Sequence, residues 1–137
     1  PDSAAPINVQ WGEDNRSCGF RVPISDKANR RVENRLPGAD SNPYLAMASQ
    51  LAAGIDGIEK KMALEPAFVG DAYGAKKVRE VPRTLRAAAE AMTRSKMLRA
   101  ALGDDVIDHY HHNAVWEQHE YDTKVTDWEV HRGFDRA

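Results

Sequence analysis

Charged side chains of alternating sign occupy every second position of one short stretch, as Arg31, Glu33 and Arg35. Side chains of a β-strand alternate between its two faces, so these three are expected to share one face. The guanidinium fork of arginine suits phosphate and carboxylate oxygens, and a carboxylate set among cations can bind a divalent metal ion. The pattern therefore predicts a site that handles phosphate, an acidic substrate and a metal.

A second interpretation needs no ligand, because the solvated face of an ordinary sheet also carries opposite charges as ion pairs. Three more cations, Arg16, Arg21 and Lys27, closely precede the alternating stretch. This local concentration of positive charge favours a functional site. The residue pattern alone leaves both interpretations open.

The length and composition of the chain indicate a globular protein. Its 137 residues suffice for one domain with a hydrophobic core, and 42% of them are hydrophobic and 29% charged. No apolar run approaches the ~20 residues of a membrane span, and the net charge of −2 argues against a general nucleic-acid binder.

The single cysteine, Cys18, cannot form an internal disulfide, which fits a reducing, cytoplasmic setting. We interpret it as a small core residue. The first residue is Pro1 rather than a methionine, which indicates a processed or truncated piece.

The segments that must position these charges predict an α+β fold. A loop over residues 1–14 leads into strands at about 15–23 and 30–37, joined by the short polar connection 24–29. Two strands alone are only marginally stable, so this antiparallel pair is expected to belong to a larger sheet. Residues 38–137 are expected to be mainly helical.

A long helix is expected to follow the strands. Asn42 and Pro43 begin it, because asparagine is a favoured N-cap and proline fits the first helical position. It is expected to run to about residue 62, with a buried stripe formed by Leu51, Ile55, Ile58 and Met62. Residues 63–82 contain prolines and glycines without helical periodicity, which predicts a long surface loop.

Capping residues, and for the third helix the acidic pair Asp104-Asp105 at its positive end, predict four further helices, at about 84–92, 95–101, 104–120 and 126–136. In the third of them, Val106, Tyr110 and Ala114 are expected to share one face. The same helix carries three closely spaced histidines, His109, His111 and His112. A metal site needs ligands that converge, and a polar helix face produces such clusters by chance, so we interpret these histidines as part of a solvated face.

Several motifs follow one another in the order and spacing of a known family. They are Asn15-Arg16-Ser17 with Arg21 and Pro23, Arg31-x-Glu33-x-Arg35 with Pro37, Asn42-Pro43-Tyr44-Leu45-Ala46, and Ala53-Gly54-Ile55-Asp56-Gly57-Ile58. In these motifs the chain resembles the C-terminal part of the glutamine synthetase family, over essentially its whole length. The resemblance implies that residues 1–137 form the C-terminal segment of one catalytic domain. The N-terminal domain and the upstream catalytic part would then be absent, and this segment alone is expected to be inactive.

The resemblance implies an ATP-dependent ligase that uses Mg²⁺ or Mn²⁺. In this family the side-chain carboxylate of glutamate takes the γ-phosphate of ATP, and an amine or ammonia then displaces phosphate to form an amide. Members assemble into large rings with active sites between adjoining subunits, so self-association is expected. Neither nucleic acid nor a membrane is an expected partner.

The resemblance also implies a role for each ionisable residue of the two predicted strands and their connection. Arg16 corresponds to a catalytic arginine near the transferred phosphate and the glutamate, and Arg35 to an arginine that holds glutamate. Glu33 corresponds to a metal ligand. The residues that correspond to nucleotide contacts are Arg21, Lys27 and Arg31.

The resemblance favours an organic amine as the acceptor. Ammonia-using members carry a mobile glutamate just before an Ala-Pro pair, whereas here Ala4 precedes the pair Ala5-Pro6. A methyl group can neither attract a cation nor accept a proton. The chain therefore looks like a γ-glutamylpolyamine synthetase or another γ-glutamyl-amine synthetase. A glutamine synthetase that uses ammonia is the alternative, and an inactive structural relative is disfavoured because the charged residues are retained.

Overall fold

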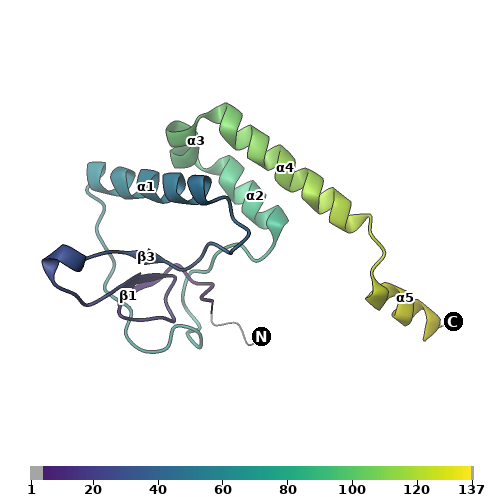
Figure 1. The fold of residues 1–137 in the computed structure, drawn as a ribbon, viewed down its shortest axis with the longest axis horizontal. Coiled ribbons are helices and arrows are strands. Elements are labelled where there is room, and N and C mark those ends of the chain that lie inside the picture. Colours follow the sequence, from purple (N-terminus) through teal and green to yellow (C-terminus); the bar gives the residue numbers. More distant parts are fainter. Residues whose placement is uncertain (1–4, 137) are drawn as a thin grey trace. The chain divides into compact units, whose positions relative to one another are not determined.

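The structure, a computed structural model, describes residues 5–136 and has the α+β architecture predicted from the sequence. The chain forms two compact units, Pro1–Val81 and Pro82–Ala137. The first unit contains β1 (Trp11–Glu13), β2 (Phe20–Val22), the 3₁₀ turn η1 (Lys27–Asn29), β3 (Glu33–Asn34) and α1 (Pro43–Glu59). The second contains α2 (Leu85–Arg94), α3 (Lys96–Leu102), α4 (Asp104–Asp122) and α5 (Asp127–Phe134) (Figure 1).

A small three-stranded sheet in the order β1-β2-β3 positions the charged residues. β2 and β3 are antiparallel, with Arg21 opposite Glu33, which confirms the predicted strand pair. Both strands are much shorter than the predicted spans 15–23 and 30–37. The sheet also contains β1, which pairs with β2 in parallel and places Gly12 opposite Arg21. The sequence had predicted only a loop leading into a strand there.

The strands are short because the segment between β1 and β2 forms a tight polar turn. The side-chain oxygen of Asn15 accepts hydrogen bonds from the backbone N–H of Ser17 at 3.0 Å and from its hydroxyl at 2.6 Å. The Ser17 hydroxyl oxygen in turn accepts from the backbone N–H of Ala72 at 2.8 Å. The buried Cys18 follows this turn, as expected of a small core residue, and burial raises the pKa of its thiol.

A buried asparagine joins the first residues of the unit to the start of β2. The side-chain amide of Asn8 donates to the Ser17 carbonyl at 2.8 Å, and its side-chain oxygen accepts from the backbone N–H of Gly19 at 3.2 Å and of Gln10 at 3.1 Å. Asn8 is only 2% exposed, and these hydrogen bonds provide partners for the oxygen and the nitrogen of its buried side-chain amide. Gly19 lies so close that a Cβ built on it would meet the Asn8 carbonyl oxygen at 2.1 Å.

The predicted surface loop over 63–82 is irregular, and it also forms hydrogen bonds with the N-terminal part of the unit. The backbone N–H of Phe68 donates to the carbonyl of Trp11, and that of Val9 donates to the carbonyl of Arg79. Ala72 is buried. The loop therefore contributes to the core that supports β1 and β2, in addition to forming surface.

Helix α1 begins as predicted, with the Asn42 side chain accepting from the backbone N–H groups of Tyr44 and Leu45 at 3.0 and 3.2 Å. It ends at Glu59, three residues earlier than expected, because the backbone of Lys61 turns left-handed with φ 50°. No residue of this helix is buried. The predicted buried stripe is therefore wrong for the described residues.

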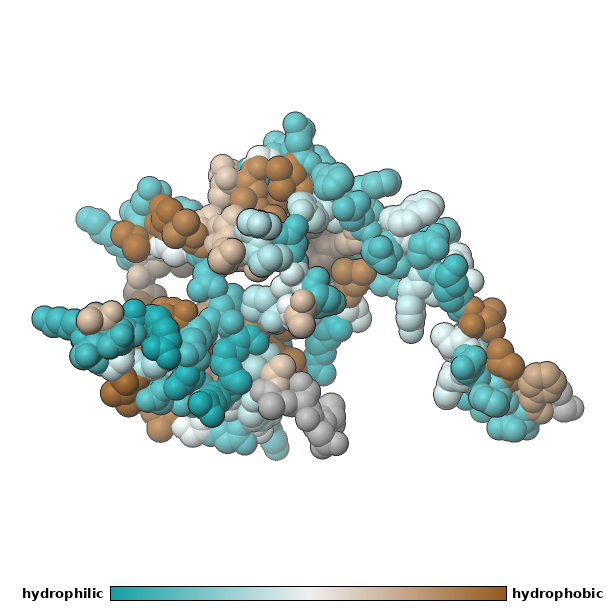
Figure 2. All heavy atoms as spheres, viewed as in Figure 1, coloured by the Kyte–Doolittle hydropathy of each residue, from teal (hydrophilic) through white to brown (hydrophobic). Residues whose placement is uncertain are grey.

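The four residues of that stripe are between 47% and 78% exposed: Leu51, Ile55, Ile58 and Met62. Figure 2 shows apolar side chains on the visible surface of α1. The periodicity correctly indicates an apolar helix face, and no other segment of residues 5–81 buries it.

Helices α2, α3 and α5 begin at the predicted caps, with Thr84, Ser95 and Thr126 each accepting from a backbone N–H of the first helical turn. Helix α4 begins at Asp104, as predicted, with no side-chain cap among the described residues. Thr126 also forms the predicted capping box with Glu129. Helices α2 and α4 extend a few residues beyond their predicted ends, to Arg94 and Asp122 respectively.

Helix α4 packs against both α2 and α3. Its buried residue is Ile107, whereas Val106, which was expected on the packed face, is exposed. The other two residues expected on that face, Tyr110 and Ala114, are half-buried, so the prediction is wrong only at Val106. None of the helices in residues 5–136 is long and apolar enough to cross a membrane.

Candidate functional site: an arginine and carboxylate cluster on the sheet

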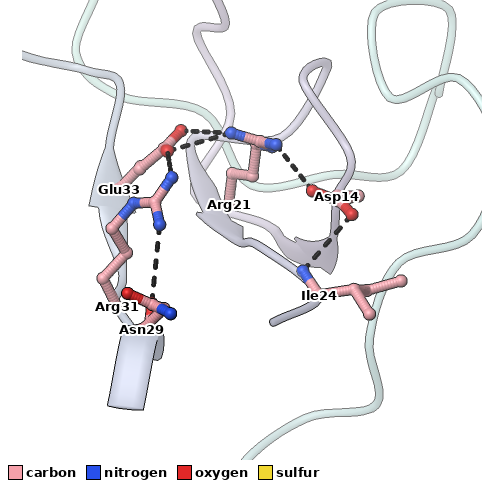
Figure 3. Close-up of polar contacts among 6 residues, drawn as sticks. All are labelled: Asp14, Arg21, Ile24, Asn29, Arg31 and Glu33. Atoms are coloured by element: carbon pink, nitrogen blue, oxygen red, sulfur yellow. Dashed lines mark hydrogen bonds and ion pairs between the residues drawn. The ribbon is translucent and has the colours of Figure 1, made fainter. Parts of the chain in front are cut away.

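Arg21 and Glu33 form the centre of a charged cluster on adjacent strands. Because the two residues are directly opposite in the antiparallel register, their side chains leave the same face of the sheet. Nη1 of Arg21 donates to both carboxylate oxygens of Glu33, at 2.9 and 2.8 Å. Arg31, two residues before Glu33, lies 3.3 Å from the same carboxylate through Nη2 (Figure 3). The structure therefore brings together three of the predicted site residues.

Asp14 is a member of this cluster that the sequence analysis did not identify. Its Oδ1 accepts from Nη2 of Arg21 at 2.6 Å, and its Oδ2 accepts from the backbone N–H of Ile24 at 3.3 Å. The residue follows β1 with a left-handed backbone, φ 47°. Aspartate is one of the few side chains that enter this conformation readily, so a lone aspartate directly after a strand was the available signal.

The cluster shifts the pKa values of its members toward the charged forms. The hydrogen bond from Arg21 is the main cause of the lowered pKa of Glu33, and burial opposes it. For Asp14 the pKa is lowered first by the Ile24 backbone N–H and then by Arg21. The pKa of Arg21 is raised, mainly by Glu33. All three groups are therefore charged near neutral pH.

These shifts predict a loss of stability in acid. The folded-state pKa lies below the ordinary value of 3.8 for Asp14 and of 4.5 for Glu33. A carboxyl with a lowered pKa stabilises the fold fully above its unfolded-state pKa, and loses this effect as the pH falls through the folded-state value. We expect the melting temperature to fall with pH below about 4.5, and to fall less steeply in Asp14→Asn. Calorimetry across this pH range tests this, and equal slopes would contradict it.

The other three predicted site residues lie outside the network of ion pairs. Arg16 is exposed in the turn before β2, where its carbonyl oxygen accepts from the hydroxyl of Tyr73 at 3.3 Å. Lys27 is exposed in η1. Arg35 directly follows β3 and is half-buried, and its backbone N–H donates to the carbonyl of Gly19 at 2.8 Å.

Three shielded donors of this segment have no hydrogen-bond acceptor among the described residues: Nε of Arg21, Oγ of Ser25 and Nη1 of Arg35. Such groups are rare in folded proteins, and each calls for an explanation. An oxygen of an anionic ligand is one kind of acceptor to which each of them could donate. The donor set therefore fits phosphate or carboxylate oxygens.

An open hollow of about 370 Å³ adjoins this segment. Glu13, Val22, Pro23, Ile24, Ser25 and Arg30 line it. Among these described residues Arg30 is the one cation, and the other polar side chains are those of Glu13 and Ser25. The hollow therefore combines an apolar wall with a few polar groups, as ligand sites commonly do.

The described residues do not form a complete metal site. They contain no group of three or more histidine, cysteine, aspartate or glutamate side chains able to hold an ion. Glu33 provides one carboxylate, and both of its oxygens accept from arginines. Mg²⁺ prefers six oxygen ligands in octahedral geometry. A metal at Glu33 would therefore need further ligands from outside these residues.

Comparisons with known proteins show the family to which the chain belongs. Residues 1–133 match the family described as glutamine synthetase, catalytic domain. A γ-glutamylethanolamide synthetase of Streptomyces coelicolor is 48% identical over 136 residues, which cover 99% of this chain and 29% of that protein. A glutamate–isopropylamine ligase of a Pseudomonas species is 37% identical, with 93% of this chain and 28% of that protein covered. A glutamine synthetase of Thermus thermophilus is also 37% identical, with 96% and 31% covered.

Solved structures are also similar to this chain in fold. A structure described as a GmaS/ADP complex superposes with a TM-score of 0.84 and 29% identity, over 96% of this chain and 30% of that one. A Plasmodium falciparum glutamine synthetase, at 15% identity, has a TM-score of 0.75, which shows the likeness in fold, over 96% of this chain and 35% of that one. The chain thus spans roughly a third or less of the length of each of these proteins. It belongs to the glutamine synthetase family, and its residues 1–133 are part of that family's catalytic domain.

Proposed function

We propose that the protein containing this chain is an ATP-dependent ligase that joins glutamate to an amine through γ-glutamyl phosphate. The observation that carries the proposal is the cluster of Arg21, Glu33 and Arg31, with unpaired donors beside it, in a chain that belongs to the glutamine synthetase family. A cluster of fixed cations suits a reaction in which negative charge moves between phosphate and carboxylate oxygens.

The proposed reaction has two steps. A side-chain carboxylate oxygen of glutamate attacks the γ-phosphorus of ATP, so the new P–O bond forms as ADP leaves. The amine nitrogen then attacks the acyl carbon, phosphate leaves, and the nitrogen loses a proton to a base. Most of the catalysis in such phosphoryl transfers comes from positioning and from offsetting charge on the transferring oxygens.

Each charged residue has a proposed part in these steps. Arg16 contacts the transferred phosphate and the glutamate, and Arg35 holds the glutamate carboxylate. The nucleotide phosphates are bound by Arg21, Lys27 and Arg31. Glu33 supplies one ligand to a divalent ion, Mg²⁺ or Mn²⁺, whose positive charge offsets phosphate charge when it is bound.

The proposed acceptor is an organic amine. Support comes from two relatives that are named for ethanolamide synthesis and for isopropylamine ligation, the first of them 48% identical. Ala4, which led to the same expectation, lies outside the described residues. Ammonia is the second candidate, supported by the Thermus thermophilus relative named glutamine synthetase.

We further propose that the protein forms a ring whose active sites lie between subunits. Light scattering would measure the mass of this assembly.

A panel of acceptors tests the proposed function. The full-length protein, with ATP, glutamate and a divalent metal, would receive ethanolamine, isopropylamine, putrescine, spermidine or ammonium at equal concentration. We expect phosphate release with at least one organic amine, a product with the mass of the γ-glutamyl amide, and at least tenfold lower kcat/KM with ammonium. Release with ammonium alone would establish the second candidate. No amide product with any acceptor would refute a ligase.

A further inference from the structure

Arg21 is held at two separate points of its guanidinium group. Both hydrogen bonds to Glu33 come from the same nitrogen, Nη1. A planar group tied through one nitrogen can still pivot about it. The bond from Nη2 to Asp14 at 2.6 Å is the second fixed point, and it removes this freedom (Figure 3). The Arg21 side chain is 16% exposed, so little solvent competes for these contacts.

Asp14 is itself held in place by the backbone around it. Its N–H donates to the carbonyl of Val22 at 3.0 Å, and its second carboxylate oxygen accepts from the N–H of Ile24 at 3.3 Å. The left-handed backbone, φ 47°, is a conformation that most side chains avoid. The segment that follows β1 therefore keeps the carboxylate beside β2.

We propose that Asp14 is a positioning residue that fixes the plane of the Arg21 guanidinium, and with it the orientation in which Arg21 meets the nucleotide phosphates. This inference rests on the proposed role of Arg21 in ATP binding. Asp14 itself touches no substrate. It acts by limiting the orientations that Arg21 samples before the nucleotide binds, and such preorganisation improves affinity without a new contact.

Three substitutions at this position separate positioning from other roles. Asp14→Asn keeps one oxygen acceptor, which can face Arg21, and tolerates the left-handed backbone, but removes the charge and the oxygen that accepts from Ile24. Asp14→Gly keeps the backbone and removes the acceptor, and Asp14→Ala loses both. If Asp14 acts by positioning, the KM for ATP is expected to stay within about twofold of wild type in the Asp14→Asn variant. In Asp14→Gly and Asp14→Ala the KM is expected to be about tenfold higher, which is the loss expected for one charge-assisted hydrogen bond. The kcat should change less than the KM.

Other outcomes overturn the proposal. If Gly behaves like wild type and only Ala is impaired, Asp14 serves only the turn. If Asn and Gly are equally impaired, the negative charge matters rather than the position of the acceptor. Melting temperatures measured on the same samples show whether a variant is merely unstable.

A double-mutant cycle identifies the residue through which Asp14 acts. In an Arg21→Ala background, Asp14→Gly should change the KM for ATP by less than twofold, because there is no guanidinium left to orient. A full tenfold effect in that background would refute the proposal. The assay is made on full-length protein with the best acceptor amine. If wild-type protein forms no amide at all, the proposed function fails, whereas active wild type with unchanged Asp14 variants refutes this inference alone.

Discussion

Glu33→Ala is expected to lower kcat by about 100-fold or more, because the substitution removes the shared counterion of Arg21 and Arg31 and the proposed metal ligand. Without the carboxylate, Arg21 and Arg31 lose their common anchor, and of the two only Arg21 keeps a carboxylate partner among the described residues, Asp14. Oligomeric state should be unchanged, because Glu33 belongs to a small charged cluster and not to the buried core. Steady-state phosphate release over a range of Mg²⁺ concentrations measures the effect.

Asp56→Ala is a matched control for this change. Asp56 forms an ion pair of the i, i+4 type with Lys60 on α1, at 2.6 Å. Such a helix pair contributes only about 0.3–0.5 kcal/mol, so activity should stay close to wild type. Unchanged metal-dependent turnover in a folded Glu33→Ala protein would refute the role proposed for Glu33.

Gly19→Ala is expected to destabilise the fold by about 3 kcal/mol and to remove activity. The added Cβ would lie 2.1 Å from the carbonyl oxygen of Asn8 and 3.1 Å from Cδ2 of Leu36. The first contact is with backbone, so it cannot be relieved by a change of rotamer, and overpacking in a filled core costs about 1–3 kcal/mol or more. The clash lies one residue before β2, so relief of it would displace Arg21.

Gly54→Ala is the same substitution at a position where we expect stabilisation instead of destabilisation. Gly54 lies inside α1, and no other atom lies within 4 Å of the position its Cβ would take. Alanine should therefore stabilise the helix by up to about 1 kcal/mol. Urea unfolding of both variants measures the contrast. A Gly19→Ala protein as stable as wild type would show that Asn8 and Gly19 are not packed as described.

The helices could be predicted well from the sequence because their limits depend on neighbouring residues. The capping side chains of Asn42, Thr84, Ser95 and Thr126 accept from N–H groups only two or three residues ahead, so the relevant partners are visible in any short window. Which of two neighbouring residues in α4 is buried was less predictable. Ile107 and Val106 are both apolar, and only contact with the neighbouring helices selects the one that is buried.

The sheet could be predicted only in part because one pairing in it is unusual. The antiparallel pairing of Arg21 with Glu33 follows from a short connection, as expected. Parallel strands normally need a connection of about a dozen residues or more, so a parallel pair formed by β1 and β2 across one tight turn has no sequence signal. Asp14 was missed because only the fold of that turn brings it next to Arg21. The alternation of charges did predict that Arg31 and Glu33 meet.

The uncovered face of α1 has a practical consequence for work with these 137 residues alone. Apolar side chains at Leu51, Ile55, Ile58 and Met62 would be in contact with water along much of one helix. A contiguous surface of this kind promotes aggregation, and salts such as sulfate strengthen the tendency by favouring burial. The 137-residue polypeptide alone is therefore expected to aggregate least at low protein concentration and in buffers without such salts.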